Sequence, residues 1–243
     1  MVFSKERRKI LSGLTRWFAV LWLTSSAHPG RAAVDVDRQH RQAAMKLPPP
    51  KTIGLITVEE ALEQRRTVRA YQSRSLTLNQ LSQLLWAAQG LTGDSGYKRA
   101  APSAGALYPM DVYAVLGRNS IAQMEAGVYR YEPKKHALSE IARQDVKDAV
   151  AKAALRQMWT AKAPVNLIIT AEYRRVTGKY HQRGERYAMI EAGHIGQNIF
   201  LQAEALGLKA GIVGAFRDHA LKRVLKIPPS HEPLMIMPVG YGA

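Results

Sequence analysis

The chain has 243 residues, of which 47% are hydrophobic, and this apolar content excludes a disordered chain and suffices for a folded domain with a sizeable core. It contains no cysteine, which excludes a disulfide framework, a cysteine-based zinc site and a thiol nucleophile. The net charge of +16 would suit nucleic acid only if it were clustered, and because no aromatic-interleaved basic motif is present we expect no nucleic-acid partner.

Residues 1–32 have the composition of an export signal. The pair Arg7 and Arg8 is followed by apolar residues, and a modestly apolar stretch covers residues 17–23. Small residues stand at the −3 and −1 positions of a cleavage site in the segment 30–32. We therefore expect a twin-arginine-like signal peptide and a periplasmic or other extracytoplasmic location. A disordered basic tail and an uncleaved anchor are the alternatives.

A linker is expected between this signal and the folded domain. A transmembrane span needs about 20 apolar residues, and Arg16 interrupts the apolar stretch, so we expect no stable membrane span. Residues 33–56 contain the run Pro48-Pro49-Pro50 and are predicted to form an extended linker. The folded domain is then expected over residues 57–243.

Two capping boxes predict the first two helices of this domain. Thr57 and Glu60 form one, and Thr77 and Gln80 form the other, whose helix is expected to end at Gly90. A basic cluster, Arg65-Arg66-Thr67-Val68-Arg69, stands at the end of the first helix. Taken alone, this cluster can be a solvated helix end stabilised by the helix dipole.

Small residues between two prolines make Ala101-Pro102-Ser103-Ala104-Gly105-Ala106-Leu107-Tyr108-Pro109 the most distinctive segment. Such a run has few side-chain atoms to pack, so its backbone can lie against a planar ligand and offer N–H and hydroxyl donors. The alternative is a tight turn before a strand. Ser103 lacks the Gly-x-Ser-x-Gly context of a hydrolase nucleophile.

The rest of the chain predicts an α+β fold in which helices cover a sheet. Strands are expected at 111–116 and 127–132 as an antiparallel pair, at 165–171 as a strand covered on both faces, and at 234–239 as the last strand. The longest helix is expected over 187–206 and is closed by Gly207, and residues 211–214 form a strand or a loop.

Two polar patterns remain in the second half of the chain. The stretch 179–187 begins with Lys179 and Tyr180 and can be a loop of solvated charges. The sequence from Glu191 to His194 is one Glu-x-x-His motif without a second copy, so we expect no metal and interpret His194 as a packing or hydrogen-bonding residue.

The Arg65–Arg69 cluster and the Ala101–Pro109 run together resemble the nitroreductase-type flavoprotein family, and specifically its SagB/ThcOx-type dehydrogenase branch. The resemblance extends from about Val58 to Gly240. It implies a nitroreductase-like fold, a mixed β-sheet flanked by helices, with FMN at a homodimer interface.

The resemblance also implies a role for each matching residue. Four residues match the family's phosphate motif: Arg65, Arg66, Thr67 and Arg69. Four match the segment that contacts the flavin of the opposite subunit: Pro102, Ser103, Ala104 and Gly105. Three match the loop against the flavin ring: Gly211, Val213 and Gly214. The pair Lys179 and Tyr180 is similar to the Lys-Tyr region implicated in oxidation by azoline dehydrogenases.

The function implied is an FMN-dependent oxidoreductase that takes hydride from a small-molecule or peptide substrate. Ala106 and Tyr108 stand where nitroreductase-type relatives carry Asn and Gln, which favours the dehydrogenase branch. An exported enzyme also meets little NAD(P)H. An NAD(P)H-dependent nitroreductase-type reductase and a non-catalytic flavin-binding module are the alternatives.

Overall fold

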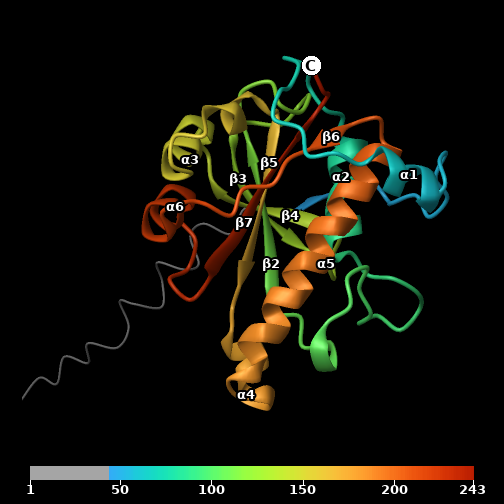
Figure 1. The fold of residues 1–243 in the computed structure, drawn as a ribbon, viewed down its shortest axis with the longest axis vertical. Coiled ribbons are helices and arrows are strands. Elements are labelled where there is room, and N and C mark those ends of the chain that lie inside the picture. The colour runs from blue at the N-terminus through green and yellow to red at the C-terminus, as the bar shows by residue number, and fades with distance from the viewer. Residues whose placement is uncertain (1–43) are drawn as a thin grey trace, which may run out of the picture. The chain divides into compact units, whose positions relative to one another are not determined.

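A seven-stranded sheet runs through residues 44–243, the part of the chain that the structure describes. In this computed structural model the strands lie in the order β1-β4-β3-β2-β5-β7-β6 (Figure 1). Their bounds are β1 Met45–Lys46, β2 Met110–Leu116, β3 Gly127–Glu132, β4 Ala137–Ala142, β5 Val165–Ala171, β6 Lys209–Ala210 and β7 Glu232–Gly240. Neighbouring strands are antiparallel, and parallel pairing occurs in two isolated bridges, Thr67 with Ala210 and Leu76 with Ile121.

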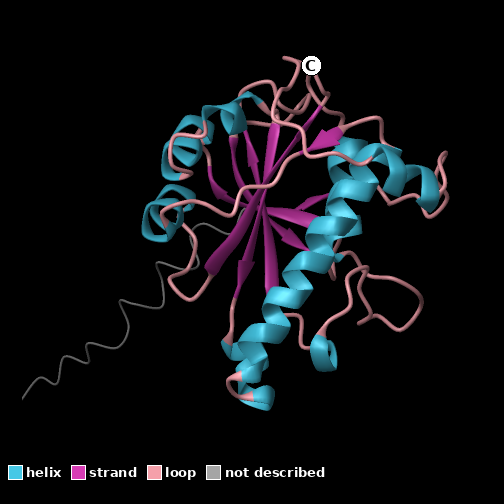
Figure 2. Cartoon of the chain, in the orientation of Figure 1, coloured by secondary structure: helices cyan, strands magenta, loops and turns pink. Residues whose placement is uncertain are grey.

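Six α-helices lie on the two faces of this sheet in the described part of the chain (Figure 2). They are α1 Val58–Gln64, α2 Leu78–Gln89, α3 Lys147–Ala153, α4 Arg174–Tyr180, α5 Arg183–Ala205 and α6 Asp218–Leu225, with short 3-10 turns at Ala104–Ala106 and Met158–Lys162. One core lies between the sheet and α2 and α5, and the other between the sheet and α3 and α6. The predicted α+β class is confirmed.

The central strands join these two cores. In β5, Leu167 and Ile169 point into the core under α2 and α5, whereas Ile168 points into the core under α3 and α6. All seven residues of β5 are buried, which is the reason its sequence is almost continuously apolar. The structure confirms the strands predicted at 127–132 and 165–171 to the residue.

Both predicted capping boxes are present. The Thr57 hydroxyl accepts from the Glu60 N–H at 3.1 Å, and the Glu60 carboxylate accepts from the Thr57 N–H at 2.7 Å. Thr77 and Gln80 make the same reciprocal pair at 3.2 and 2.9 Å. These caps fix where α1 begins, and a helix of seven residues then delivers the chain to the basic cluster.

Several elements differ from the prediction or were not predicted. The longest helix begins four residues early, at Arg183, and the last strand two residues early, at Glu232. Strand β4 and helices α3, α4 and α6 were not predicted. Val176 is the one buried residue of α4, too small an apolar face for a helical period to show. The stretch 179–187, for which a loop was the alternative, forms the end of α4 and the start of α5.

Residues 45–51 are attached to the domain. β1 pairs with β4, the Ser82 hydroxyl donates to the Pro48 carbonyl at 2.6 Å, and the Lys51 N–H donates to the Gln83 side chain at 2.8 Å. The predicted signal at 1–32 and the first part of the linker lie outside the described residues. No described helix is long and apolar enough to cross a membrane.

Candidate active site

The basic cluster continues from the end of α1 and lies beside β6. Thr67 forms a parallel bridge with Ala210, and the Val68 N–H donates to the Ala210 carbonyl at 2.9 Å. These bonds place the cluster against the strand that leads into Gly211. The structure therefore brings together two segments that are about 140 residues apart in the sequence.

The arginines of the cluster have different environments. Arg66 donates to the carbonyls of Glu63 and Arg65, at 2.7 and 2.8 Å, and so caps the end of α1. The Arg65 guanidinium lies 5.3 Å from the centre of the Phe200 ring on α5. The Arg69 guanidinium lies 5.8 Å from the Trp159 ring centre.

Neither Arg65 nor Arg69 has an acidic partner among the described residues. Arg66 therefore fits the alternative in which a basic residue stabilises the end of the helix. Arg65 and Arg69 leave their charge available to an anion.

The segment 211–214 follows the edge of β7. Val213 exchanges both backbone hydrogen bonds with Ile236, at 2.8 and 2.9 Å. A Cβ on Gly211 would lie 2.7 Å from the Val68 carbonyl oxygen and 2.8 Å from the Trp159 ring, so only glycine permits this approach. Gly214 is exposed, and a Cβ there would meet no atom within 4 Å. We call residues 65–69, Trp159 and 211–214 the basic half-site.

The small-residue run is a strained, firmly held turn. Gly105, Ala106 and Tyr108 have φ angles of 61°, 54° and 48°, in the left-handed region that non-glycine residues seldom adopt. The Ser103 hydroxyl accepts from the Tyr108 N–H at 2.9 Å. The Arg99 N–H donates to the Tyr108 hydroxyl at 3.2 Å, and its guanidinium lies 4.3 Å from the centre of that ring. These contacts hold the exposed backbone of Gly105 and Ala106 in one conformation, in which it can contact a ligand.

Lys179 and Tyr180, at the end of α4, lie directly against this turn. A Cβ on Gly105 would be 2.7 Å from the Tyr180 hydroxyl and 3.2 Å from the Lys179 ammonium. Tyr180 also packs edge-on against Tyr187 of α5, with ring centres 5.2 Å apart. The predicted catalytic pair thus lies beside residues 102–106. We call residues 102–106, Lys179 and Tyr180 the turn half-site.

An ion-pair network that the sequence did not reveal holds α4 in this place. Arg175 contacts Asp111 at 2.8 Å and Glu172 at 2.7 Å, and it also donates to the Tyr108 carbonyl at 3.4 Å. The Nε2 atom of His231 lies 3.8 Å from both carboxylates. These residues come from β2, from the end of β5, from α4 and from the start of β7, so no local sequence pattern could have shown the network.

Asp111, Glu172 and His231 are also spaced as metal ligands could be. The Arg175 guanidinium, however, already contacts both carboxylates, at 2.8 and 2.7 Å. Burial lowers the pKa of His231, and its Nδ1 is 2.7 Å from the Tyr113 hydroxyl. A guanidinium is therefore the cation of this cluster, which anchors α4 to the sheet.

A buried carboxyl lies behind the turn half-site. Glu191 of α5 is 2% exposed and accepts from the Gln89 side chain at 3.0 Å. Arg99 donates to the same Gln89 at 2.9 Å. Burial raises the pKa of Glu191. His194 is exposed and has no hydrogen-bond partner among the described residues, so its interpretation as a packing or hydrogen-bonding residue was wrong.

The two half-sites lie at opposite ends of α5 (Figure 1). Arg65 packs on Phe200 near one end, and Tyr180 packs on Tyr187 near the other. Thirteen residues at 1.5 Å each separate these two α5 residues by about 20 Å along the helix axis. One copy of the chain therefore does not bring its own half-sites together.

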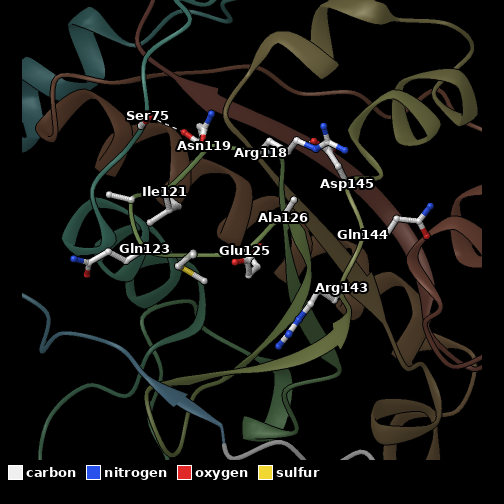
Figure 3. Close-up of a pocket in the computed structure, with 12 residues that line it drawn as sticks. Ser75, Arg118, Asn119, Ile121, Gln123, Glu125, Ala126, Arg143, Gln144 and Asp145 are labelled. Atoms are coloured by element: carbon white, nitrogen blue, oxygen red, sulfur yellow. Dashed lines mark hydrogen bonds between the residues drawn. The ribbon is translucent and has the colours of Figure 1, made fainter.

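A cavity lies away from both half-sites. It has a volume of about 970 Å³ and lies between the β2–β3 and β4–α3 loops (Figure 3). Arg118, Arg143 and Asp145 are among its lining residues, and the Ser75 hydroxyl donates to the Asn119 carbonyl at its rim. None of the site residues predicted from the sequence lines this cavity.

A sequence model of the nitroreductase family matches residues 62–241. The protein named "Putative nitroreductase MJ1384" from Methanocaldococcus jannaschii is 45% identical over 185 residues, which are 76% of this chain and 91% of that protein. The trifolitoxin-processing protein TfxB from Rhizobium leguminosarum bv. trifolii is 32% identical over 57% of this chain and 38% of its own length. A crystal structure of a "putative nitroreductase" from Ralstonia eutropha JMP134 has a TM-score of 0.70 at 27% identity and covers 83% of this chain and 90% of that one.

Proposed function

The chain belongs to the nitroreductase family, with the nitroreductase-like fold predicted, and from this premise we propose that it is an FMN-dependent oxidoreductase that works as a homodimer. The observation that carries the proposal is the separation of the two half-sites by the length of α5. Each half-site offers one part of what a flavin needs, and a second copy is required to supply the other part.

The residues of the basic half-site fit FMN. Arg65 and Arg69 have no acidic partner among the described residues, and guanidinium groups bind phosphate oxygens in a bidentate way. Thr67 can add a hydroxyl donor. The exposed backbone at Gly214, where no Cβ intervenes, leaves room for a flat ring. When bound, FMN would supply the hydride chemistry, and these residues would hold its phosphate and its ring.

Exposed apolar residues support a second copy. On α5, Met189 and Ile190 are 57% and 49% exposed, and a Cβ on the neighbouring Gly193 would meet no atom within 4 Å. On and before α1, Val58 is 64% and Leu55 is 97% exposed. Exposed apolar side chains of this size favour burial against a partner. In such a dimer the Ser103–Gly105 turn of one copy would reach the flavin held by the other.

We propose dehydrogenation as the direction of the reaction. Loss of hydride from a carbon atom is easier when a base removes the proton of the neighbouring heteroatom. Lys179 and Tyr180, which project at the Gly105 turn, are placed to take or relay that proton. The likeness to a trifolitoxin-processing protein supports a peptide or other organic substrate. The likeness to MJ1384 favours a second candidate, an NAD(P)H-dependent reductase.

The visible spectrum of the purified protein, with and without added FMN, tests the cofactor. A colourless protein that takes up no flavin would refute the proposed function. Anaerobic reduction of the bound FMN by organic donors then tests the direction. Lys179→Ala and Tyr180→Phe should each slow reduction by about 100-fold or more while FMN stays bound, because general-base catalysis contributes that much. Rapid reduction by NADPH that neither substitution affects would establish the reductase instead.

A further inference from the structure

An exposed basic patch surrounds the turn half-site. It consists of Arg174, Arg183 and Arg186 on α4 and α5, and it flanks Lys179. Arg183 and Arg186 have no acidic partner among the described residues. Arg174 is 3.8 Å from the Glu172 carboxylate, which Arg175 already binds at 2.7 Å. Glu185, exposed in the first turn of α5, is the one acidic residue of the stretch 174–186, so the patch keeps a net positive charge.

The position of two of these arginines is unfavourable for the helix. Arg183 and Arg186 lie in the first turn of α5, where the positive end of the helix dipole opposes cations. Their spacing of three residues also brings like charges together. By contrast, Lys135 pairs with Glu132 at 2.8 Å and Lys222 pairs with Glu232 at 2.7 Å. Helix stability therefore does not account for this pair.

We propose that the α4–α5 basic patch binds carboxylate or phosphate groups of the substrate that reacts at the turn half-site. The inference rests on the proposed function, because that function places the reacting carbon beside Lys179 and Tyr180. Guanidinium groups suit both oxyanions, which they bind through paired N–H donors. A patch with net positive charge beside the turn half-site also raises the local concentration of anionic ligands and their association rate.

Two electron acceptors of opposite charge test the patch without knowledge of the substrate. The FMN-loaded protein is reduced with dithionite and reoxidised in a stopped-flow instrument by ferricyanide, an anion, or by hexaammineruthenium(III), a cation. Two equivalents of either acceptor remove the two electrons of the reduced flavin, and two protons are released. From about 10 mM to about 1 M salt the Debye length falls from about 30 to about 3 Å, so the ferricyanide rate should fall and the hexaammineruthenium rate should rise.

Charge-reversal variants assign the effect to the patch. Arg183→Glu with Arg186→Glu should slow ferricyanide at low salt by about tenfold or more and speed hexaammineruthenium. Arg183→Gln with Arg186→Gln changes the charge by half as much and should give about half of that effect on a logarithmic scale. This milder variant keeps the test valid if the charge-reversed protein does not fold. Arg223→Glu with Lys226→Glu changes the net charge equally on exposed residues at the end of α6, on the other face of the sheet, and should change neither rate comparably.

Competition separates the two sources of the oxyanion. Inhibition of ferricyanide reoxidation by citrate indicates a polycarboxylate substrate, and inhibition by NADP⁺ alone indicates the phosphates of a dinucleotide. Inhibition by neither, or equal loss in the α6 control, would overturn the inference. A protein without FMN fails the proposed function instead, because no reduced form can then be prepared.

Discussion

Two glycines of one loop offer a test of where the flavin ring lies. At Gly211 a methyl group would overlap the Val68 carbonyl oxygen at 2.7 Å and the Trp159 ring at 2.8 Å. At Gly214 the same methyl group would meet no atom within 4 Å. Gly211→Ala therefore changes the protein itself, whereas Gly214→Ala changes only what can approach the loop from outside.

The expected magnitudes follow from these contacts. Gly211→Ala forces a methyl group into packed backbone and should lower the free energy of unfolding by about 1–3 kcal/mol. Gly214→Ala restricts the unfolded chain at no packing cost, so the apoprotein should be unchanged or more stable by about 0.4–1 kcal/mol. If the ring lies on Gly214, the methyl group should weaken FMN binding by about 1–3 kcal/mol, or roughly 5- to 150-fold in Kd.

Urea denaturation of both apoproteins measures the stabilities, and quenching of FMN fluorescence on titration measures the Kd. If Gly214→Ala leaves the apoprotein stable and weakens FMN binding, the flavin ring contacts this loop. An unchanged Kd for this variant would refute contact between the ring and the 211–214 loop, even if the protein binds FMN.

Other expectations follow from single residues. Arg65→Ala should weaken FMN binding by about 1.5–3 kcal/mol, measured by the same titration, whereas Arg66→Ala, which removes the cap of α1, should weaken it much less. Because burial raises the pKa of Glu191 in the folded protein, its contribution to stability is complete below about pH 4.3 and is lost as the pH rises through the folded pKa. Glu191→Gln should therefore be more stable than the unchanged protein at about pH 8 and should lose this advantage toward about pH 4, as urea denaturation at both values will show. We further propose export by the twin-arginine route, so replacing Arg7 and Arg8 by Lys should leave the precursor in the cytoplasm, and normal export in cell fractions would exclude that route.

The elements that the sequence predicted to the residue are those whose signal is local. β5 is buried on both faces, and a mostly apolar run after Pro164 is sufficient to define it. Helix α4 has the opposite character. Its stability comes from Arg175, which contacts carboxylates on β2 and after β5, and such partners are adjacent only after the sheet has formed. Local periodicity therefore could not show this helix.

The same distinction applies to the site. The segments of the two half-sites could be predicted separately. A phosphate-binding cluster and a turn of small residues each need particular residue types at neighbouring positions. The contact between Gly105 and Tyr180 was not predictable from pattern, since it depends on how α4 is anchored. In the sequence, Glu191 stands out only as half of a metal-binding motif. The structure shows that Glu191 is buried behind Ser103 and that this burial raises its pKa.

The 970 Å³ cavity beside Arg118 and Arg143 shares no residue with either half-site. A ligand held between two copies would instead meet a different surface of each copy. The basic half-site and the turn half-site are two such surfaces, about 20 Å apart along α5. Since no motion within a folded helix can shorten that separation, two copies packed along α5 are the arrangement in which both half-sites can act on one flavin.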